Sequence, residues 1–208
     1  MDNYSKYTLH PWHGVHFGEN APETVTSYVE IVPTDTVKYE VDKTSGIIKV
    51  DRPQQFSNIF PALYGFIPQT LCDIEVGKYC SEKTGIPGII GDQDPLDICI
   101  LTSCNIPHSN ILVKAIPIGG FRMIDGNEAD DKIIAVMKGD ALYESWKELG
   151  DANKSIIQRM KHYFLTYKDM PGAEVRKCEI THTYGREEAN EVIRKSIEDY
   201  KIRFAKHL

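Results

Sequence analysis

Residues 92–101 read Asp-Gln-Asp-Pro-Leu-Asp-Ile-Cys-Ile-Leu. The last four residues form a short apolar run, which is typical of a β-strand buried in a core. Three carboxylates, Asp92, Asp94 and Asp97, stand directly before this run. An extended backbone puts Asp92 and Asp94 on the same side, and Pro95 turns the chain before Asp97 begins the strand. All three carboxylates can therefore face one concavity.

Short β-rich segments surround this stretch. Residues 37–42 alternate strictly between apolar and charged side chains, which predicts a strand with Lys38, Glu40 and Asp42 on one face. The turn chemistry of residues 43–46 leads to a second strand, so we expect a hairpin with Arg52 just past its end. The further expected strands cover residues 27–32, 98–102, 111–118 and 133–137, with turns at Pro107, Pro117 and Gly119-Gly120.

The periodicity becomes helical from residue 153 onward. Ile156, Met160 and Phe164 recur at helical spacing, and residues 169–172, Asp-Met-Pro-Gly, are expected to end this helix. A second helix is expected over residues 186–205. Several short strands followed by helices predict an α+β fold, namely a small closed antiparallel β-barrel of OB-like type with helices packed on its outside.

Composition narrows the class of protein. The 208 residues contain no linker-like segment, so we expect a single domain over residues 1–208. The 24 basic and 30 acidic residues give a formal charge of −6, whereas binders of nucleic acid or anionic membranes need a clustered basic surface.

Residues 1–6 lack an apolar signal segment and no apolar run has the length of a membrane span, so a cytoplasmic location is expected. The five cysteines lack a C-x-x-C pair and suit reduced thiols.

A second acidic group, Asp125 and Asp130, has Lys132 behind it. Carboxylates without His or Cys suit a hard divalent cation better than zinc, and Mg²⁺ usually shares one or two carboxylates with substrate phosphates. We therefore expect a magnesium site that handles phosphate. The first acidic group alone also fits a solvated turn, although it lacks the central Gly and closing Glu of an EF-hand loop. Tyr167 and Lys168 have a plainer interpretation too, as a core residue and a partner of the helix dipole.

Several segments point to one family when they are taken together in order. They are residues 38–43 (Lys-Tyr-Glu-Val-Asp-Lys), Gly46, 50–52 (Val-Asp-Arg), 64–71 (Tyr-Gly-Phe-Ile-Pro-Gln-Thr-Leu), 91–97 (Gly-Asp-Gln-Asp-Pro-Leu-Asp), the D-G-x-x-x-D-x-K block of 125–132, and 167–169 (Tyr-Lys-Asp). This set resembles the soluble family I inorganic pyrophosphatases. The resemblance implies hydrolysis of inorganic diphosphate to two orthophosphates by activated water.

The resemblance also implies a role for each matching position. The metal ligands would be Asp92, Asp97 and Asp130 for the activating Mg²⁺, and Asp125 and Glu40 for further Mg²⁺ ions that arrive with substrate. The two phosphoryl groups would be held by Lys38, Arg52, Tyr64, Lys132, Tyr167 and Lys168. Asp94 would accept a proton from the attacking water. Pyrophosphate is densely negative, so in-line attack requires cations and Lys/Arg side chains to neutralise its oxygens.

Three features depart from the family pattern. Phe60 stands where the family often has Tyr, so a hydroxyl is missing there. The interval from Glu30, which matches an outer acidic position, to Lys38 is shorter than in compact bacterial members. Residues 72–91 are longer than in those members and resemble the eukaryote-like branch. We expect a homo-oligomer, either a hexamer as in the compact members or a dimer as in the longer branch.

Two other functions are compatible with parts of the sequence. An oligonucleotide-binding barrel could keep the fold without the chemistry, but it would need a basic groove and stacking aromatic residues. Metal-dependent hydrolysis of tripolyphosphate or a nucleotide would use the same groups, although nothing in the chain resembles a P-loop.

Overall fold

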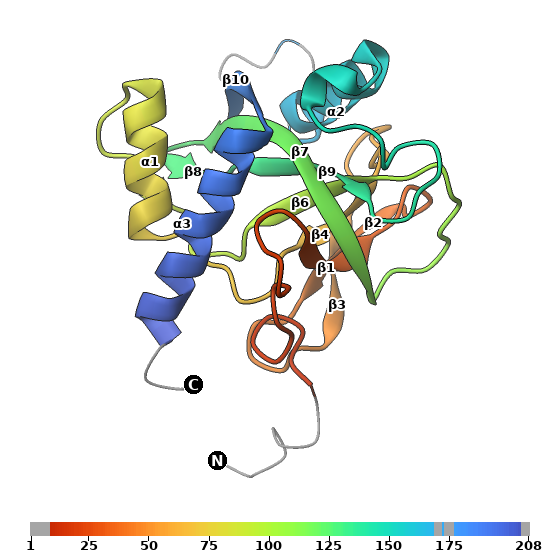
Figure 1. Cartoon of the computed structure of the whole chain (residues 1–208), viewed down its shortest axis with the longest axis horizontal. Helices are drawn as coiled ribbons and strands as arrows, with labels where there is room; N and C mark the ends of the chain where they lie inside the picture. The colour runs from red at the N-terminus through yellow and green to blue at the C-terminus, as the bar shows by residue number, and fades with distance from the viewer. Residues whose placement is uncertain (1–8, 169–171, 173–176, 205–208) are drawn as a thin grey trace.

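The computed structural model describes residues 9–168, 172 and 177–204. The strands gather in the centre of the molecule, with helices α1 and α3 on one side and α2 on the other (Figure 1). The hairpin of β2 and β3 forms a separate two-stranded sheet. In chain order the elements are β1 (Val25–Ile31), β2 (Val37–Val41), β3 (Ile48–Pro53), β4 (Leu63–Phe66), α1 (Ile74–Thr84), β5 (Ile90–Gly91), β6 (Asp97–Leu101), β7 (Ile111–Asp125), β8 (Glu128–Ala129), β9 (Lys132–Met137), the 3₁₀ turn η2 (Leu149–Asp151), α2 (Lys154–Thr166), β10 (Cys178–Gly185) and α3 (Arg186–Phe204).

Five strands pair in a ring. Their order is β1-β4-β6-β9-β7, and the first part of β7 returns to pair with β1. This arrangement confirms the α+β class and the OB-like set of strands around a core. It is a ring of pairings and not a formally closed barrel, because the last part of β7 leaves the ring to pair with β8 and β10.

The prediction that the strands are all antiparallel was wrong. β6 runs parallel to β9, and β5 runs parallel to β8. A parallel pair needs a crossover connection, and the long β7 supplies it between β6 and β9. The sheet is therefore mixed. This pairing matters for the site, because it places the first residue of β6, Asp97, directly beside the first residue of β9, Lys132.

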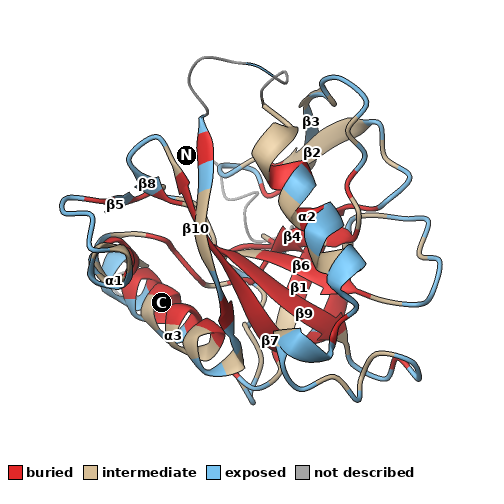
Figure 2. Ribbon diagram, turned by 90° about the horizontal axis from the view of Figure 1, so that it is seen from above, coloured by how far each residue is buried: buried red, intermediate tan, exposed pale blue. Residues whose placement is uncertain are grey.

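β6 is buried on both faces. Ile98 and Ile100 pack in a core that includes residues of α1 and α3, while Cys99 and Leu101 pack in a second core with residues of α2. Figure 2 shows the central strands buried and the outward sides of the helices exposed. Burial on both faces explains why the run after Asp97 is continuously apolar and does not alternate.

β7 continues through Gly119-Gly120, where a turn was expected. A Cβ atom on Gly120 would lie 2.4 Å from the ring of Tyr184, and one on Gly119 would lie 2.4 Å from the backbone oxygen of Tyr184. The two glycines therefore let β10 pass close to the strand. Close backbone approach is the other common reason for glycine inside a strand.

α1 lies within residues 72–91 and was not predicted. Its N-terminus has no local side-chain cap, and instead the carboxylate of Asp199 in α3 accepts hydrogen bonds from the N–H groups of Asp73, Glu75 and Val76 at 2.9–3.0 Å. A cap supplied from so far along the chain leaves no start signal in the local pattern. None of the described helices is long and apolar enough to span a bilayer.

The strands and helices that were predicted lie close to their expected positions, and α2 and α3 start within a residue of expectation. Residues 169–171, expected to help end the first of these helices, and residue 205, expected to end the second, lie outside the described residues. The short strands β4, β5 and β8, and the longer β10, were missed.

Candidate active site

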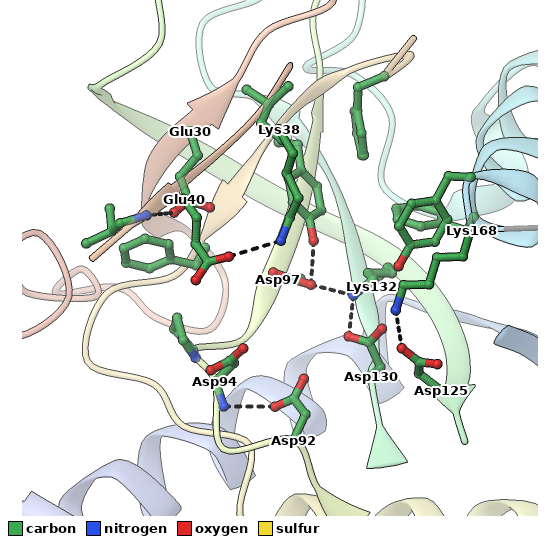
Figure 3. Close-up of a pocket in the computed structure, with 18 of the residues that line it drawn as sticks. Glu30, Lys38, Glu40, Asp92, Asp94, Asp97, Asp125, Asp130, Lys132 and Lys168 are labelled. Carbon is green, nitrogen blue, oxygen red and sulfur yellow. Dashed lines mark hydrogen bonds and ion pairs between the residues drawn. The ribbon is translucent and has the colours of Figure 1, made fainter. Parts of the chain in front are cut away.

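One cavity of about 240 Å³ opens between the β2–β3 hairpin, the strand ring and the end of α2. All of the candidate site residues line it, and they come from seven parts of the chain: Lys38 and Glu40, Arg52, Tyr64, Asp92, Asp94 and Asp97, Asp125, Asp130 and Lys132, and Tyr167 and Lys168. In Figure 3 the carboxylates of Asp92, Asp97 and Asp130 surround a shared space, with Lys38 and Lys168 reaching toward it from other sides.

Lys132 lies at the centre of the cavity wall and its side chain is only 3% exposed. Its ammonium group contacts the carboxylates of both Asp97 and Asp130. Tyr64 donates a 2.5 Å hydrogen bond to Asp97 Oδ2. Burial lowers the pKa of Lys132, but the carboxylates of Asp130 and Asp97 outweigh it and raise that pKa well above its usual value. Lys132 is therefore a permanent cation.

The hairpin forms a second wall. Lys38 and Glu40 stand two residues apart on β2 and both line the cavity. Lys38 Nζ lies 3.1 Å from carboxylate oxygens of both Glu40 and Asp51. Arg52 pairs with Lys38 across the two strands, and its guanidinium lies 2.7 Å from Asp51. Asp51 thus separates two like charges. Although burial lowers the pKa of Lys38, Glu40 and Asp51 raise it, so that Lys38 also stays charged.

The C-terminal end of α2 forms the third wall. Asn153 caps the start of α2, where its side chain accepts a hydrogen bond from the Ser155 N–H, and Tyr167 caps the C-terminal end. The Tyr167 ring stacks on Tyr163 at 5.3 Å, and the Lys168 ammonium contacts Asp125 at the end of β7. Tyr167 is thus both a packed residue and a lining residue. The plainer interpretation of Tyr167 and the site interpretation are both compatible with this placement.

The loop before β6 forms the cavity mouth. The Asp94 N–H donates a 2.9 Å hydrogen bond to Asp92 Oδ1, which fixes the loop in a tight turn. The Asp94 side chain is 46% exposed and contacts the Lys43 ammonium at the hairpin tip. Asp94 is therefore more exposed to solvent than Asp97, whose side chain is 22% exposed.

A sequence-family model described as inorganic pyrophosphatase matches residues 27–201 of this chain. The chain is also 46% identical to the inorganic pyrophosphatase of Chlamydia caviae over 202 residues, which cover 95% of this chain and 94% of that protein. The chain belongs to the inorganic pyrophosphatase family.

Solved structures agree with this membership. The crystal structure of the Thermus thermophilus inorganic pyrophosphatase matches with a TM-score of 0.77 and 28% identity, covering 92% of this chain and 99% of that one. The type I inorganic pyrophosphatase of Toxoplasma gondii matches with a TM-score of 0.80, covering 94% and 88% of the two chains, but at 23% identity it supports only the fold. The pyrophosphatase resemblance inferred from the motifs is confirmed.

Membership in the pyrophosphatase family implies a divalent metal cofactor, and the cavity fits one. Its acidic groups supply oxygen ligands only, as hard divalent cations prefer. Burial, together with the nearby Asp130 and Asp97, raises the pKa of Asp92, so the Asp92 carboxylate resists being charged without added positive charge. No Lys, Arg or His among the described residues pairs with Asp92.

The carboxylates are not preassembled into a metal cage. The described part of the chain contains no group of three or more His, Cys, Asp or Glu side chains that could hold an ion as it stands. Ammonium groups of Lys132 and Lys168 stand against Asp97, Asp130 and Asp125 instead. A cation that keeps several of its waters is compatible with this wider spacing.

The cavity includes residues that were not predicted. Lys43 was assigned to the hairpin turn and given no role in the site, but its ammonium group contacts Asp94. Asp42 beside it accepts hydrogen bonds from Ser45 in the turn. Trp12 lies before the residues matched to the family, so no motif contains it. Glu128 stands inside the D-G-x-x-x-D-x-K block, where the pattern leaves its position open.

Two of the three departures from the family pattern, at Phe60 and Glu30, lie in the cavity wall. Phe60 is buried, and its ring lies 4.5 Å from the rings of Tyr64 and Tyr163, where it supports them by packing. Glu30 is buried and accepts a 2.7 Å hydrogen bond from the Val41 N–H, which ties β1 to the hairpin. Burial raises the pKa of Glu30 to about 8.

Proposed function

We propose that this cavity hydrolyses inorganic pyrophosphate to two phosphates with Mg²⁺ as the cofactor, by in-line attack of water. The observation that carries the proposal is the convergence of carboxylates and cationic side chains from seven parts of the chain on one cavity of about 240 Å³. A small, densely charged anion and the cations that neutralise it need both kinds of group at one place.

The carboxylates of Asp92, Asp97 and Asp130 would hold the activating metal, and Asp125 and Glu40 would hold ions that enter with the substrate. When bound, Mg²⁺ supplies positive charge to the phosphoryl oxygens and lowers the pKa of a coordinated water. Lys132 and Lys168 contact three of these carboxylates through one oxygen each, so the metal can bind the other oxygen or take the place of the ammonium group. Lysine suits such an exchange, since its ammonium is a compact charge on a flexible stem.

The six remaining polar groups are proposed to hold the substrate. Lys38 and Arg52 face the cavity from the hairpin, so they can bind one phosphoryl group together while Asp51 limits their repulsion. Tyr167 and Lys168 face it from the end of α2 and can bind the other. Tyr64 and Lys132 lie between these two walls, where the bridging region of the substrate would fall.

Asp94 is the proposed general base. Its side chain is 46% exposed, against 22% for Asp97, so it can pass a proton from the attacking water to solvent after each turnover. Its contact with Lys43 gives the carboxylate a fixed orientation at the cavity mouth.

The test is phosphate release from pyrophosphate with Mg²⁺, with a chelator in excess, and with ATP or tripolyphosphate as substrate. We expect rapid release from pyrophosphate only when metal is present. Equal release in the chelated sample would overturn the metal proposal. Faster release from tripolyphosphate or ATP would assign the cavity to a different phosphate ester or anhydride.

Three further properties belong to this proposal, namely domain organisation, cellular location and assembly. We propose that residues 1–208 act as one domain, that the protein works in the cytoplasm, and that it assembles as a homo-oligomer, either a dimer or a hexamer. The resemblance of residues 72–91 to the longer branch supports the dimer. Analytical ultracentrifugation of the purified protein separates a dimer from a hexamer by mass.

A further inference from the structure

A second charged cluster lies in the interior, outside the cavity. Arg122 of β7 is fully buried, and its guanidinium contacts the carboxylate of Asp131 and lies 2.8 Å from Glu188 of α3. The rings of Tyr79 in α1 and Tyr184 in β10 lie 5.1 and 5.0 Å from the guanidinium carbon. The cluster therefore joins β7, β10, α1, α3 and the segment before β9.

Asp131 connects this cluster to the cavity through its place in the chain. It stands between Asp130 and Lys132, and successive side chains of an extended segment point to opposite sides. Asp130 and Lys132 line the cavity and contact one another, whereas Asp131 is buried on the other side against Arg122. A carboxylate held by Arg122 thus fixes the backbone from which both cavity side chains project.

The backbone of the same segment is held to β7 as well. The Asp130 N–H donates a 3.0 Å hydrogen bond to the oxygen of Met123, and Lys132 pairs with Phe121 across the β7–β9 ladder. Arg122 lies between these two β7 residues. The ladder sets the register of the segment, and the ion pair sets which side chains face the cavity.

Stability alone does not account for a buried ion pair. Removing two charges from water is so costly that well-packed apolar residues of similar volume often stabilise a core as well or better. The Arg122–Asp131 pair is fully buried and stands directly behind two site residues. A role in geometry accounts for both facts.

We propose that Arg122 and Asp131 are positioning residues of the active site, which hold Asp130 and Lys132 in the orientation needed to bind the metal and the substrate. Neither residue touches the cavity, so both act through the backbone of residues 130–132. The inference rests on the proposed function only for the identity of the metal and substrate; the orientation of the segment can be measured in the metal-free protein.

The main test replaces the pair by apolar residues, in the double variant Arg122→Met/Asp131→Leu, which removes both fully buried charges and leaves Glu188 its contacts with His182 and Lys83. We expect a folded protein by circular dichroism with a Tm near or above that of the wild type, but with Mn²⁺ or Mg²⁺ affinity and kcat each lower by roughly ten- to hundredfold, as for other supporting residues behind a metal site. Metal affinity is measured by calorimetry without substrate. A folded double variant with affinity and kcat within twofold of the wild type would overturn the proposal.

Two further measurements decide the matter if the double variant does not fold. Arg122→Lys keeps the charge but loses the planar two-sided grip, and we expect it to weaken metal binding as well; normal affinity would count against positioning. In the wild type without metal, hydrogen exchange should show the Asp130 amide, which donates to the oxygen of Met123, as protected as the amides of the central strands. Rapid exchange there would mean that the segment is not held.

A matched control is Asp140→Asn, which disturbs another fully buried carboxylate away from the cavity. Asp140 accepts hydrogen bonds from residues 102–103 and 142–143. We expect a lower Tm with unchanged metal affinity and kcat. If the wild type itself fails to hydrolyse pyrophosphate, the proposed function fails, whereas the exchange and metal-affinity results still judge the positioning role.

Discussion

The two sides of residues 130–132 carry similar groups in different settings. On the cavity side, Lys132 contacts the carboxylates of Asp97 and Asp130. On the sealed side, Arg122 contacts those of Asp131 and Glu188. Each cluster places one cation against two carboxylates, but the first opens to a cavity and uses a flexible lysine, while the second is closed and uses a planar arginine between two tyrosine rings.

The choice of cation explains the difference in what the two clusters can do. A lysine ammonium can leave its carboxylates when a metal or phosphate arrives, because its charge is compact and its stem rotates. An arginine fixed by two carboxylates and two rings has no such freedom. The cavity cluster is therefore suited to exchange, and the sealed cluster is suited to holding the backbone that carries it.

The substitution with the largest expected effect removes the carboxylate at the centre of the cavity cluster. Asp97→Ala removes the carboxylate that contacts Lys132 and Tyr64 and that we propose as a ligand shared by two metal ions. We expect no measurable turnover, with little recovery at high Mg²⁺, because the shared ligand is gone. Calorimetric titration should show weaker binding of the first two ions, and unchanged affinity would contradict the assignment. Asp42→Ala, which removes a carboxylate of the hairpin turn, serves as the control.

A substitution with a smaller expected effect distinguishes the proposed proton acceptor, Asp94, from the proposed metal ligands beside it. Asp94→Asn should fold and bind the first metal within a few-fold of the wild type, yet lower kcat by roughly 10²- to 10⁴-fold, the range typical of a lost general base. Part of the loss should return at higher pH, where hydroxide is more abundant. Steady-state kinetics as a function of pH provides the measurement. A normal kcat, or a defect entirely due to weak metal binding, would show that Asp94 has another role.

The next effect tests the cationic walls without touching the carboxylates. Arg52→Ala and Lys168→Ala should each lower kcat/KM about ten- to hundredfold, since each removes a charge-assisted hydrogen bond to phosphate. First-metal affinity should stay near that of the wild type. Lys49→Ala removes an exposed cation from the same strand as Arg52 and should be nearly neutral. A marked loss of metal affinity in either variant at Arg52 or Lys168 would place that residue in the metal site.

The smallest effect concerns Asp140, a buried carboxylate that forms no ion pair with a Lys, Arg or His of the described residues. Asp140 accepts hydrogen bonds from the Ser103 N–H at 2.6 Å, the Thr102 hydroxyl at 2.8 Å and the Leu142 N–H at 2.9 Å. Although burial raises its pKa, these bonds lower it to about 2, from 3.8 in the unfolded chain. Because the folded pKa is the lower one, the stabilisation is fully present above pH 3.8 and is lost as the pH falls toward 2.

Asp140→Asn should therefore lower the free energy of unfolding by roughly 1.5–3 kcal/mol at neutral pH, the range for hydrogen bonds to a charged group. Urea unfolding at pH 6 and at pH 3 should show the difference between variant and wild type shrinking in acid. A difference that grew in acid would mean that Asp140 is protonated in the folded protein.

The sequence predicted which residues gather in the cavity better than it predicted the topology. Local order along the chain carries the motifs, so Asp92, Asp97 and Lys132 were identified without knowledge of which strands pair. The parallel pairing of β6 with β9, which places Asp97 beside Lys132, has no local signal because it depends on the path of β7 between them. The turn predicted at Gly119-Gly120 was wrong for the same reason, because Gly120 makes room for β10 and the sequence does not show that β10 passes there.

Contacts that form only in the folded chain were also missed. Lys43 lies within a quoted segment, but its contact with Asp94 depends on how the hairpin tip folds over the loop. Arg122 and Asp131 look like ordinary strand residues until both are seen to be buried together. Burial and pairing across elements are tertiary properties, and a single sequence read in short windows does not contain them.

The cap that Asp199 places on α1 has a consequence for folding during synthesis. An isolated helix of 11 residues is marginal in water, and α1 has no cap of its own. Its free N–H groups meet their acceptor only when residue 199, 123 positions after Val76, has left the ribosome and docked. The helix beside the loop that leads to Asp92 is thus completed by the last helix of the chain, so we expect a nascent chain lacking α3 to hold its strands before it holds α1.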